Sequence, residues 1–267
     1  MDQHTSEIVD YYTLRYREDQ RLSARPQARL EWIRTTQLLR DLLPGPGARV
    51  LDIGGGTGEY ARALTVDGYE VRLVDLVPSH VAQARGGQPP IEARVADARA
   101  LPDADGGYDA ALLLGPLYHL VRRADRLRAL REAVRVTRPG GHVVAAVISR
   151  FAGPLDFAAT GRLDERLLDE ARTLLTDGTN DPRIGFTHAY FHRVEEITDE
   201  CAAAGLTDVV VHGVEGPAWP AAEAAAGGPA QDAVFAAALD LARLYSTEPA
   251  LIGASAHLLA AGRVPSR

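Results

Sequence analysis

The feature that most constrains the fold of this chain is a short apolar run followed at once by glycines. Residues 49–53 read Arg-Val-Leu-Asp-Ile, and residues 54–60 read Gly-Gly-Gly-Thr-Gly-Glu-Tyr. A run this short, closed by glycines, is typical of a buried parallel strand that enters a turn too tight for side chains. In open α/β sheets the helix after such a turn begins at the carboxyl edge of the strand, where its free N–H groups bind ligands. The sequence therefore predicts a strand–turn–helix unit with a ligand on the turn.

The spacing of the glycines decides which ligand fits this turn. A dinucleotide fingerprint, Gly-x-Gly-x-x-Gly, would place its third glycine where this chain has Glu59, and a pyrophosphate would then meet a carboxylate. The pattern is instead Asp52-x-Gly54-x-Gly56-x-Gly58. It resembles motif I of the class I S-adenosylmethionine (SAM) dependent methyltransferases, whose ligand has a carboxylate and a sulfonium but no phosphate. A glycine-rich turn of purely steric origin is the alternative interpretation.

Acidic residues close the next two strand-like runs. Residues 71–75 end in Asp75, whose carboxylate can accept hydrogen bonds from both ribose hydroxyls, as also happens in NAD sites. Residues 91–98 include Asp97, which the resemblance identifies as the acceptor of the adenine amino group. The run 108–120 resembles motif IV of the same family, in which backbone carbonyls after the strand face the methionine amino group.

The resemblance implies SAM as the cofactor and S-adenosylhomocysteine (SAH) as its product. Within the family, the chain is most similar to the type 11 group of small-molecule methyltransferases. A leading segment with Tyr11, Tyr12, Tyr16 and Arg17 is expected to fold over the bound SAM. The residues expected to contact SAM are Tyr12, Asp52, Gly54, Gly56, Gly58, Asp75, Leu76, Asp97, Ala98 and Leu114.

The order of apolar patterns predicts a Rossmann-like α/β fold. Residues 6–21 and 28–43 show helical spacing and form two leading helices. From 49 to 149 the chain alternates strand-like and helix-like runs, which indicates right-handed βαβ units and a sheet covered by helices on both faces. The Arg-Pro-Gly-Gly sequence at 138–141 predicts a turn before a fifth strand at 142–148. By resemblance, the sheet has seven strands, mostly parallel, with an antiparallel last strand.

The alternation fails between residues 151 and 193, where a helical piece at 163–175 is followed by turn formers at 176–182. We interpret this part as an inserted helical cap. The later patterns predict a helix at 194–204, a strand at 208–213, helices between 218 and 246, and a last strand at 257–264. The expected division of this single domain is 1–47 for helices over the cofactor, 48–150 for the SAM-binding core, 151–193 for the cap and 194–267 for completion of the sheet.

A histidine just past the fourth strand is the candidate catalytic residue. SAM is already activated, so the protein has to align donor and acceptor, and a base has to take the proton of a hydroxyl, phenol or amine acceptor. His119 occupies the expected place, although a structural hydrogen bond is an equally good explanation of it. The residues expected to line the acceptor pocket are Tyr118, Arg150, His188, Tyr190 and His192. His188 and His192 would share a helix face as metal ligands do, but no third ligand is suitably spaced, and no metal is predicted.

Composition limits the partners of the chain. The net charge of −7 argues against a polyanionic substrate, because nucleic-acid affinity depends on Lys and Arg that neutralise phosphates. All 29 basic residues are arginine, which excludes a Schiff-base lysine. The chain has no apolar run of about 18 residues that would span a membrane, and its start does not resemble a secretory signal, so a cytoplasmic protein is expected. The single cysteine, Cys201, is assigned no chemistry, and the choice between monomer and homodimer stays open.

Three functions are compatible with the sequence. The first is methyl transfer to an O, N or C atom of a small molecule, with secondary metabolism as the expected setting. The second is SAM binding without methylation, which a fold alone does not exclude. The third is a NAD-dependent oxidoreductase, disfavoured by Glu59 and by the absence of any Tyr-x-x-x-Lys pair.

Overall fold

One seven-stranded sheet organises the computed structural model, which describes residues 9, 11–12, 22, 25–184 and 187–266. The strand order is β3-β2-β1-β4-β5-β9-β8, and β9 runs antiparallel to the other six strands. The predicted fold class is therefore confirmed. The strands are β1 Arg49–Ile53, β2 Glu70–Asp75, β3 Glu92–Val95, β4 Tyr108–Leu113, β5 Thr137–Ile148, β8 Thr207–Gly213 and β9 His257–Arg263.

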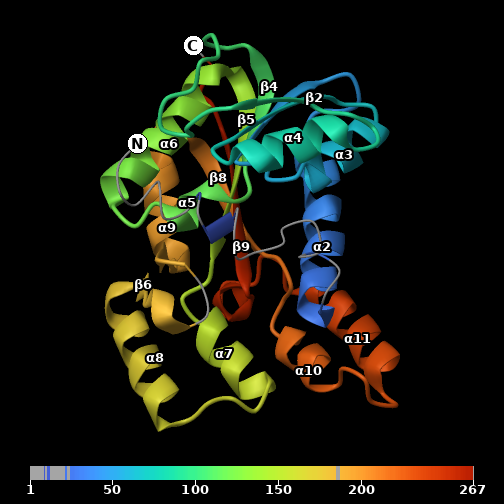
Figure 1. Cartoon of the computed structure of the whole chain (residues 1–267), viewed down its shortest axis with the longest axis vertical. Coiled ribbons are helices and arrows are strands. Elements are labelled where there is room, and N and C mark those ends of the chain that lie inside the picture. Colours follow the sequence, from blue (N-terminus) through green and yellow to red (C-terminus); the bar gives the residue numbers. More distant parts are fainter. Residues whose placement is uncertain (1–8, 10, 13–21, 23–24, 185–186, 267) are drawn as a thin grey trace.

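Helices cover both faces of the sheet (Figure 1). On one face lie α2 (Pro26–Leu42), α3 (Glu59–Val66) and α4 (Pro78–Gly86), which pack on the strands through residues such as Leu39, Leu64 and Val81. On the other face lie α6 (Arg123–Val136) and α9 (Val194–Ala203), which pack through Leu130 and Ile197. Because both faces are covered, the central strands are apolar along almost their whole length, as in other buried parallel sheets.

Beyond the carboxyl end of β5 lies a group of helices formed by α7 (Ala152–Ala159), α8 (Glu165–Asp177), α10 (Trp219–Ala224) and α11 (Gln231–Leu244) (Figure 1). Trp219, fully buried, joins Leu30 of α2 to this group of helices. A two-stranded hairpin and two short 3-10 helices complete the described chain. The remaining elements are α5 Pro116–His119, β6 Thr179–Asn180, η2 Pro182–Ile184, β7 Ala189–Tyr190 and η3 Ile252–Ala254.

Two local predictions require correction. The segment 138–141 does not form a turn that precedes the fifth strand, because β5 already begins at Thr137 and these residues lie within it. The register of β4 with β5 shifts there: Tyr108 pairs with Thr137, whereas Ala110 pairs with His142. The segment 187–192 contains β7, so His188 and His192 do not share a helix face. Most of the predicted helix at 6–21, with Tyr16 and Arg17, lies outside the described residues.

Substitution of Gly141 tests the close packing at the irregular start of β5. A Cβ atom on Gly141 would lie 2.6 Å from Thr137 Cγ2, 2.7 Å from the Asp109 carbonyl oxygen and 2.9 Å from the Arg138 carbonyl oxygen. We expect Gly141→Ala to lower the free energy of unfolding by about 2 kcal/mol, because backbone atoms have to move. Chemical denaturation followed by circular dichroism measures this change.

Gly86→Ala is the matched control, because a Cβ atom on Gly86 would meet no atom of the described chain within 4 Å and this residue ends α4. Alanine favours helix, so this variant should be unchanged or slightly more stable. Equal stability of the two variants would contradict the tight packing at Gly141.

Candidate functional site

A cleft lies at the carboxyl edge of the sheet, above the ends of β1, β2, β3 and β4. It collects most of the residues predicted for the cofactor, together with the two predicted after the fourth strand. The predicted residues that line it are Tyr12, Asp52, Gly54, Gly56, Asp75, Leu76, Asp97, Ala98, Leu114, Tyr118 and His119. Gly58 is not in the lining; its backbone begins α3 with φ of 90°.

The glycine loop between β1 and α3 is shaped by positive backbone angles and close packing. Gly54 and Gly56 have φ of 72° and 56°, in the left-handed region that favours glycine. The N–H of Gly54 donates to the Val74 carbonyl at 2.7 Å, which ties the loop to β2. A Cβ on Gly55 would overlap with Asp52 Oδ2 and lie 2.7 Å from Leu73 Cδ1. The loop therefore brings bare backbone to the floor of the cleft.

Asp75 is held in place by backbone donors. Its Oδ2 accepts from the Gly56 N–H at 2.9 Å, and its Oδ1 accepts from the Val77 N–H at 2.8 Å. His80 Nδ1 lies 3.3 Å from the same Oδ1. The sequence did not single out His80, although its place in the first turn of the helix after Asp75 is a local signal that could have identified it.

Asp52 has a different environment. Its side chain is 1% exposed, and neither carboxylate oxygen has a hydrogen-bond partner among the described residues. Burial, followed by repulsion from Asp75, raises the pKa of Asp52 to about 7. Such an acid stays partly protonated at neutral pH unless a cation binds beside it.

Asp97 is paired within its own turn. Its Oδ1 accepts from the Arg99 backbone N–H at 2.8 Å, and the Arg99 guanidinium reaches both oxygens at 2.7–3.1 Å. Burial acts to raise the pKa of Asp97, but the hydrogen bonds from Arg99 outweigh it and lower the pKa. Arg99 also lines the cleft and was missed by the sequence analysis. The Asp-x-Arg spacing is the signal that could have revealed it.

His119 joins two distant parts of the chain at the other end of the cleft. Its Nε2 lies 2.9 Å from the Tyr12 hydroxyl, and its Nδ1 lies 3.1 Å from Thr187 Oγ1. The ring of Tyr12 also meets the rings of His80 and His119 edge-on, each at a centroid distance of 5.4 Å. Thr187 was not predicted, because no local pattern relates it to position 119.

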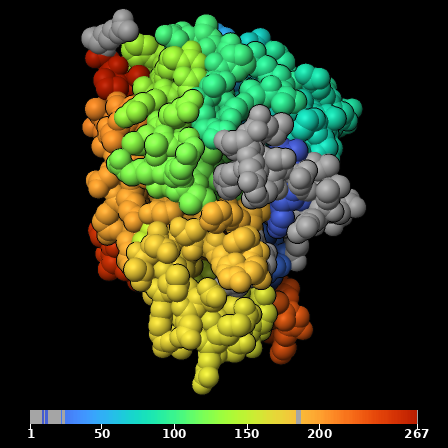
Figure 2. Space-filling model, turned by 60° about the vertical axis from the view of Figure 1, so that its left-hand side comes forward, coloured from blue at the N-terminus to red at the C-terminus, as the bar shows by residue number. Residues whose placement is uncertain are grey.

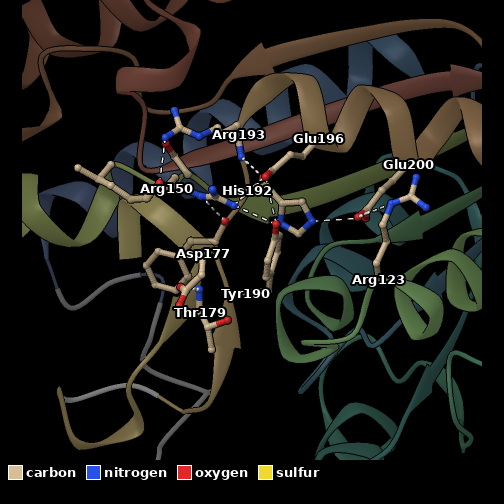
Figure 3. Close-up of polar contacts among 12 residues, drawn as sticks. Arg123, Arg150, Asp177, Thr179, Tyr190, His192, Arg193, Glu196 and Glu200 are labelled. Atoms are coloured by element: carbon tan, nitrogen blue, oxygen red, sulfur yellow. Dashed lines mark hydrogen bonds and ion pairs between the residues drawn. The ribbon is translucent and has the colours of Figure 1, made fainter. Parts of the chain in front are cut away.

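Three of the residues predicted for the acceptor pocket lie elsewhere (Figure 3). Arg150 is buried and donates to Glu196 at 2.7 Å and to the Tyr190 hydroxyl at 3.0 Å. His192 has no exposed surface, and its Nε2 lies 3.5 Å from Glu200 Oε2. None of Arg150, Tyr190 and His192 lines the cleft. Their polar groups instead contact Glu196 and Glu200 of α9.

Arg126 completes this buried network. Its guanidinium donates to Glu200 at 2.7 Å and lies 3.9 Å from the centre of the Tyr190 ring. Burial lowers the pKa of His192 despite the opposing effect of Glu200. The network joins β7 to α6 and α9, and α5 packs against β7. It therefore fixes the segment that carries Thr187 beside His119.

A second cavity of about 680 Å³ lies between α7, α8 and the hairpin. Figure 2 shows these yellow segments as the lower part of one face of the molecule. Residues that line the cavity include Arg25, Phe157, Leu174, Asn180, His188 and Phe191. Of the residues predicted for the acceptor pocket, His188 is thus on the wall of this second cavity, next to Thr187.

One group of side chains in the described chain has the composition of a metal site. Single ligand atoms of Glu31, Glu215 and His257 lie within 4.8 Å of one another. Glu215 is fully buried and already engages His257 Nδ1 at 2.5 Å, Ser255 Oγ at 2.9 Å and Gln27 Nε2 at 2.8 Å. These contacts explain the group as a buried hydrogen-bonded cluster that joins α2 to β9. In the part of the chain that is described, no helix is both long and apolar enough to cross a membrane.

Comparison with known proteins agrees with this geometry. Residues 50–141 match the family model described as a methyltransferase domain. The demethylmenaquinone methyltransferase of Beutenbergia cavernae is 37% identical over 118 residues, which are 44% of this chain and 47% of that protein. The probable tRNA methyltransferase 9B of Mus musculus is 36% identical over 122 residues, 43% of this chain and 25% of that protein. The chain thus spans half or less of the length of these curated relatives.

A solved structure extends the similarity of fold to almost the whole chain. The SAM-dependent methyltransferase of Thermotoga maritima, described as a possible histamine N-methyltransferase, superposes with a TM-score of 0.61 at 20% identity. The match covers 97% of this chain and 99% of that one. Residues 50–141, which include the glycine loop and the strands around it, thus match a methyltransferase domain, and the chain as a whole has the fold of a SAM-dependent methyltransferase.

Proposed function

We propose that the chain binds SAM in the cleft and transfers its methyl group to a small-molecule acceptor. The observation that carries this proposal is Asp52, a buried carboxylate without a hydrogen-bond partner among the described residues. A buried charge has to be paired, and an acid beside a ligand cleft is paired by a cationic ligand. The α-ammonium of SAM is such a cation, and SAM has no phosphate group that would repel the acid.

The neighbouring residues suit the rest of the molecule. Asp75, held by two backbone N–H groups, has its carboxylate fixed at the end of β2, where ribose hydroxyls would donate to it. Asp97, held by Arg99, would accept the adenine amino group beyond β3. The left-handed backbone of Gly54 and Gly56 lets the methionine part approach the main chain, where any side chain would collide.

The chemistry requires alignment and one proton acceptor. The sulfonium of SAM is already activated, and good orientation of donor and acceptor contributes about 7–11 kcal/mol to lowering the barrier. His119, at the acceptor end of the cleft, is the proposed base for an acceptor that loses a proton. No step in this mechanism calls for a metal.

Several observations favour a small acceptor. The second cavity, about 680 Å³, has the size of small-ligand sites, and His188 on its wall follows Thr187, which contacts His119. The net charge of −7 opposes a polyanion, although one relative is named as a probable tRNA methyltransferase. Release of SAH from SAM in the presence of the molecule that co-purifies with the protein tests methyl transfer against SAM binding alone. Calorimetry with SAM and with NAD tests the oxidoreductase alternative.

Removal of the Asp75 carboxylate should abolish SAM binding. We expect Asp75→Ala to weaken SAM affinity at least 100-fold and to cost about 2 kcal/mol of stability, because two backbone donors lose a charged acceptor. Isothermal titration calorimetry at a temperature where the variant is folded measures the affinity. Asp109→Ala is the matched control, since Asp109 accepts from the Arg49 N–H at 2.8 Å at the opposite edge of the sheet. Normal SAM binding by Asp75→Ala would refute the assignment.

Replacement of Asp52 should have opposite effects on stability and on binding. The pKa of Asp52 is raised to about 7 in the folded protein, so the unfolded chain gives up this proton at lower pH. Stability is therefore lost as pH rises from about 4 to 7, by up to about 4 kcal/mol. Asp52→Asn, which cannot ionise, should be at least as stable as the wild type at pH 8 and should bind SAM at least tenfold more weakly.

Proton release gives a second measurement on the same residue. If the SAM ammonium binds ionised Asp52, wild-type binding at pH 6 should release protons, and affinity should rise towards pH 8. Calorimetry in two buffers with different ionisation enthalpies counts these protons. Asp52→Asn should release correspondingly fewer, and an unchanged count would argue against contact with the ammonium.

His119 should affect turnover more than cofactor binding. We expect His119→Gln to lower the rate of SAH formation by about 100-fold or more, the typical contribution of a positioned base. SAM affinity should change no more than a few-fold. If turnover is unaffected, alignment alone suffices or another group accepts the proton.

A further inference from the structure

The contacts of His119 favour one direction for its hydrogen bonds, and the inference drawn from them deepens the proposed function on which it rests. Thr187 Oγ1 donates to the His188 carbonyl oxygen at 3.4 Å. With the hydroxyl proton in this bond, the Thr187 oxygen accepts from His119 Nδ1–H at 3.1 Å. In a neutral imidazole one nitrogen donates and the other accepts. His119 Nε2 is then the basic nitrogen, and it accepts from the Tyr12 hydroxyl at 2.9 Å.

The Tyr12 hydroxyl lies beside this basic nitrogen at the wall of the cleft. Tyr12 lines the cleft together with His119 and is half-buried, whereas His119 and Thr187 are buried. Its ring meets His80 and His119 edge-on, so three aromatic rings from separate segments fix the position of the hydroxyl. A tyrosine oxygen that donates to a base still has lone pairs with which to accept a proton from a ligand.

We propose that Tyr12 and His119 act as a two-residue proton relay, in which the Tyr12 oxygen faces the acceptor and His119 is the base behind it. The acceptor is a protic one, with its proton on oxygen or nitrogen. As the bond between the acceptor atom and the methyl carbon forms, the carbon–sulfur bond breaks and the sulfonium becomes the neutral thioether of SAH. The acceptor proton passes to Tyr12, the Tyr12 proton passes to His119 Nε2, and the imidazolium keeps its Nδ1–H bond to Thr187.

A purely structural role makes different predictions. If the Tyr12–His119 bond only holds the leading segment over the cleft, loss of the hydroxyl should weaken every ligand of the cleft equally. If the hydroxyl faces the position of the transferred methyl group, its loss should weaken selectively a ligand that places a hydrogen-bond donor there. The comparison of two ligands therefore separates the two roles.

The first measurement needs no ligand. Long-range ¹H–¹⁵N correlation spectra of the histidine side chains, assigned with His119→Gln, report which ring nitrogen of His119 carries the proton. The relay requires the Nδ1–H tautomer in the wild type and a shift of the Nε2 resonance in Tyr12→Phe. Thr187→Val, which removes the acceptor of Nδ1–H, should give a mixture of tautomers. A wild-type His119 with its proton on Nε2 would overturn the relay and leave the proposed function standing.

The second measurement uses SAH and sinefungin, a SAM analogue with an amine-bearing carbon in place of the methylated sulfur. We expect Tyr12→Phe to weaken sinefungin binding about tenfold or more, because a hydrogen bond to a charged group is lost, while SAH affinity stays within twofold. Isothermal titration calorimetry gives both affinities. Tyr11→Phe is the matched control, because it removes a hydroxyl from the neighbouring residue, which does not line the cleft.

The two affinities distinguish failure of the relay from failure of the proposed function. Equal losses of sinefungin and SAH affinity in Tyr12→Phe would assign Tyr12 a structural role and overturn the relay. Unchanged affinity for both ligands would do the same. A wild-type protein that binds neither ligand would overturn the proposed function itself, and the relay with it.

Discussion

Burial of two carboxylates at one edge of a parallel sheet is the constraint on which the rest of the structure depends. β1 and β2 end side by side, so Asp52 and Asp75 meet at the floor of the cleft. The glycine loop donates a backbone N–H to Asp75 but none to Asp52, whose pKa rises to about 7 through burial and through its acidic neighbour. A buried acid without a hydrogen-bond partner among the described residues lowers the stability of the fold. Proteins retain destabilising features of this kind at functional sites. In the proposed function, the cationic ligand SAM pairs with this acid.

The opposite end of the cleft is built by segments that are far apart in the sequence. Tyr12, His119 and Thr187 come from the leading segment, from α5 and from the hairpin, and they meet through two hydrogen bonds. The hairpin is in turn fixed by the buried network of Arg126, Glu200 and Tyr190. A region predicted as a cap over the acceptor therefore contributes to the site through its anchoring to α6 and α9.

Features with a local signal in the sequence were predictable, whereas features that depend on distant partners were not. The acids at the ends of the strands were predictable, because parallel strands bring their carboxyl ends to one edge. His80 and Arg99 were within reach of the same reasoning, since each lies a few residues after a predicted acid. Arg150 and His192 were predicted for the acceptor pocket and contact Glu196 and Glu200, because the sequence of an irregular segment does not distinguish a polar residue that faces a ligand from one that faces a carboxylate. The shift in register at 137–142 was hidden for the same reason, since it depends on the pairing of β5 with β4.

The sequence by itself determined the order of strands and helices, the glycine loop and the acids that follow β1, β2 and β3. Hydrophobic periodicity and glycine spacing are properties of short segments, so they can be recognised without the tertiary structure. Only the tertiary structure decided which polar side chains reach the cleft, which residues contact His119 and which acid has no hydrogen-bond partner among the described residues. Those properties depend on burial and on hydrogen bonds between residues more than 60 positions apart, such as His119 and Thr187, and packing alone brings such residues together.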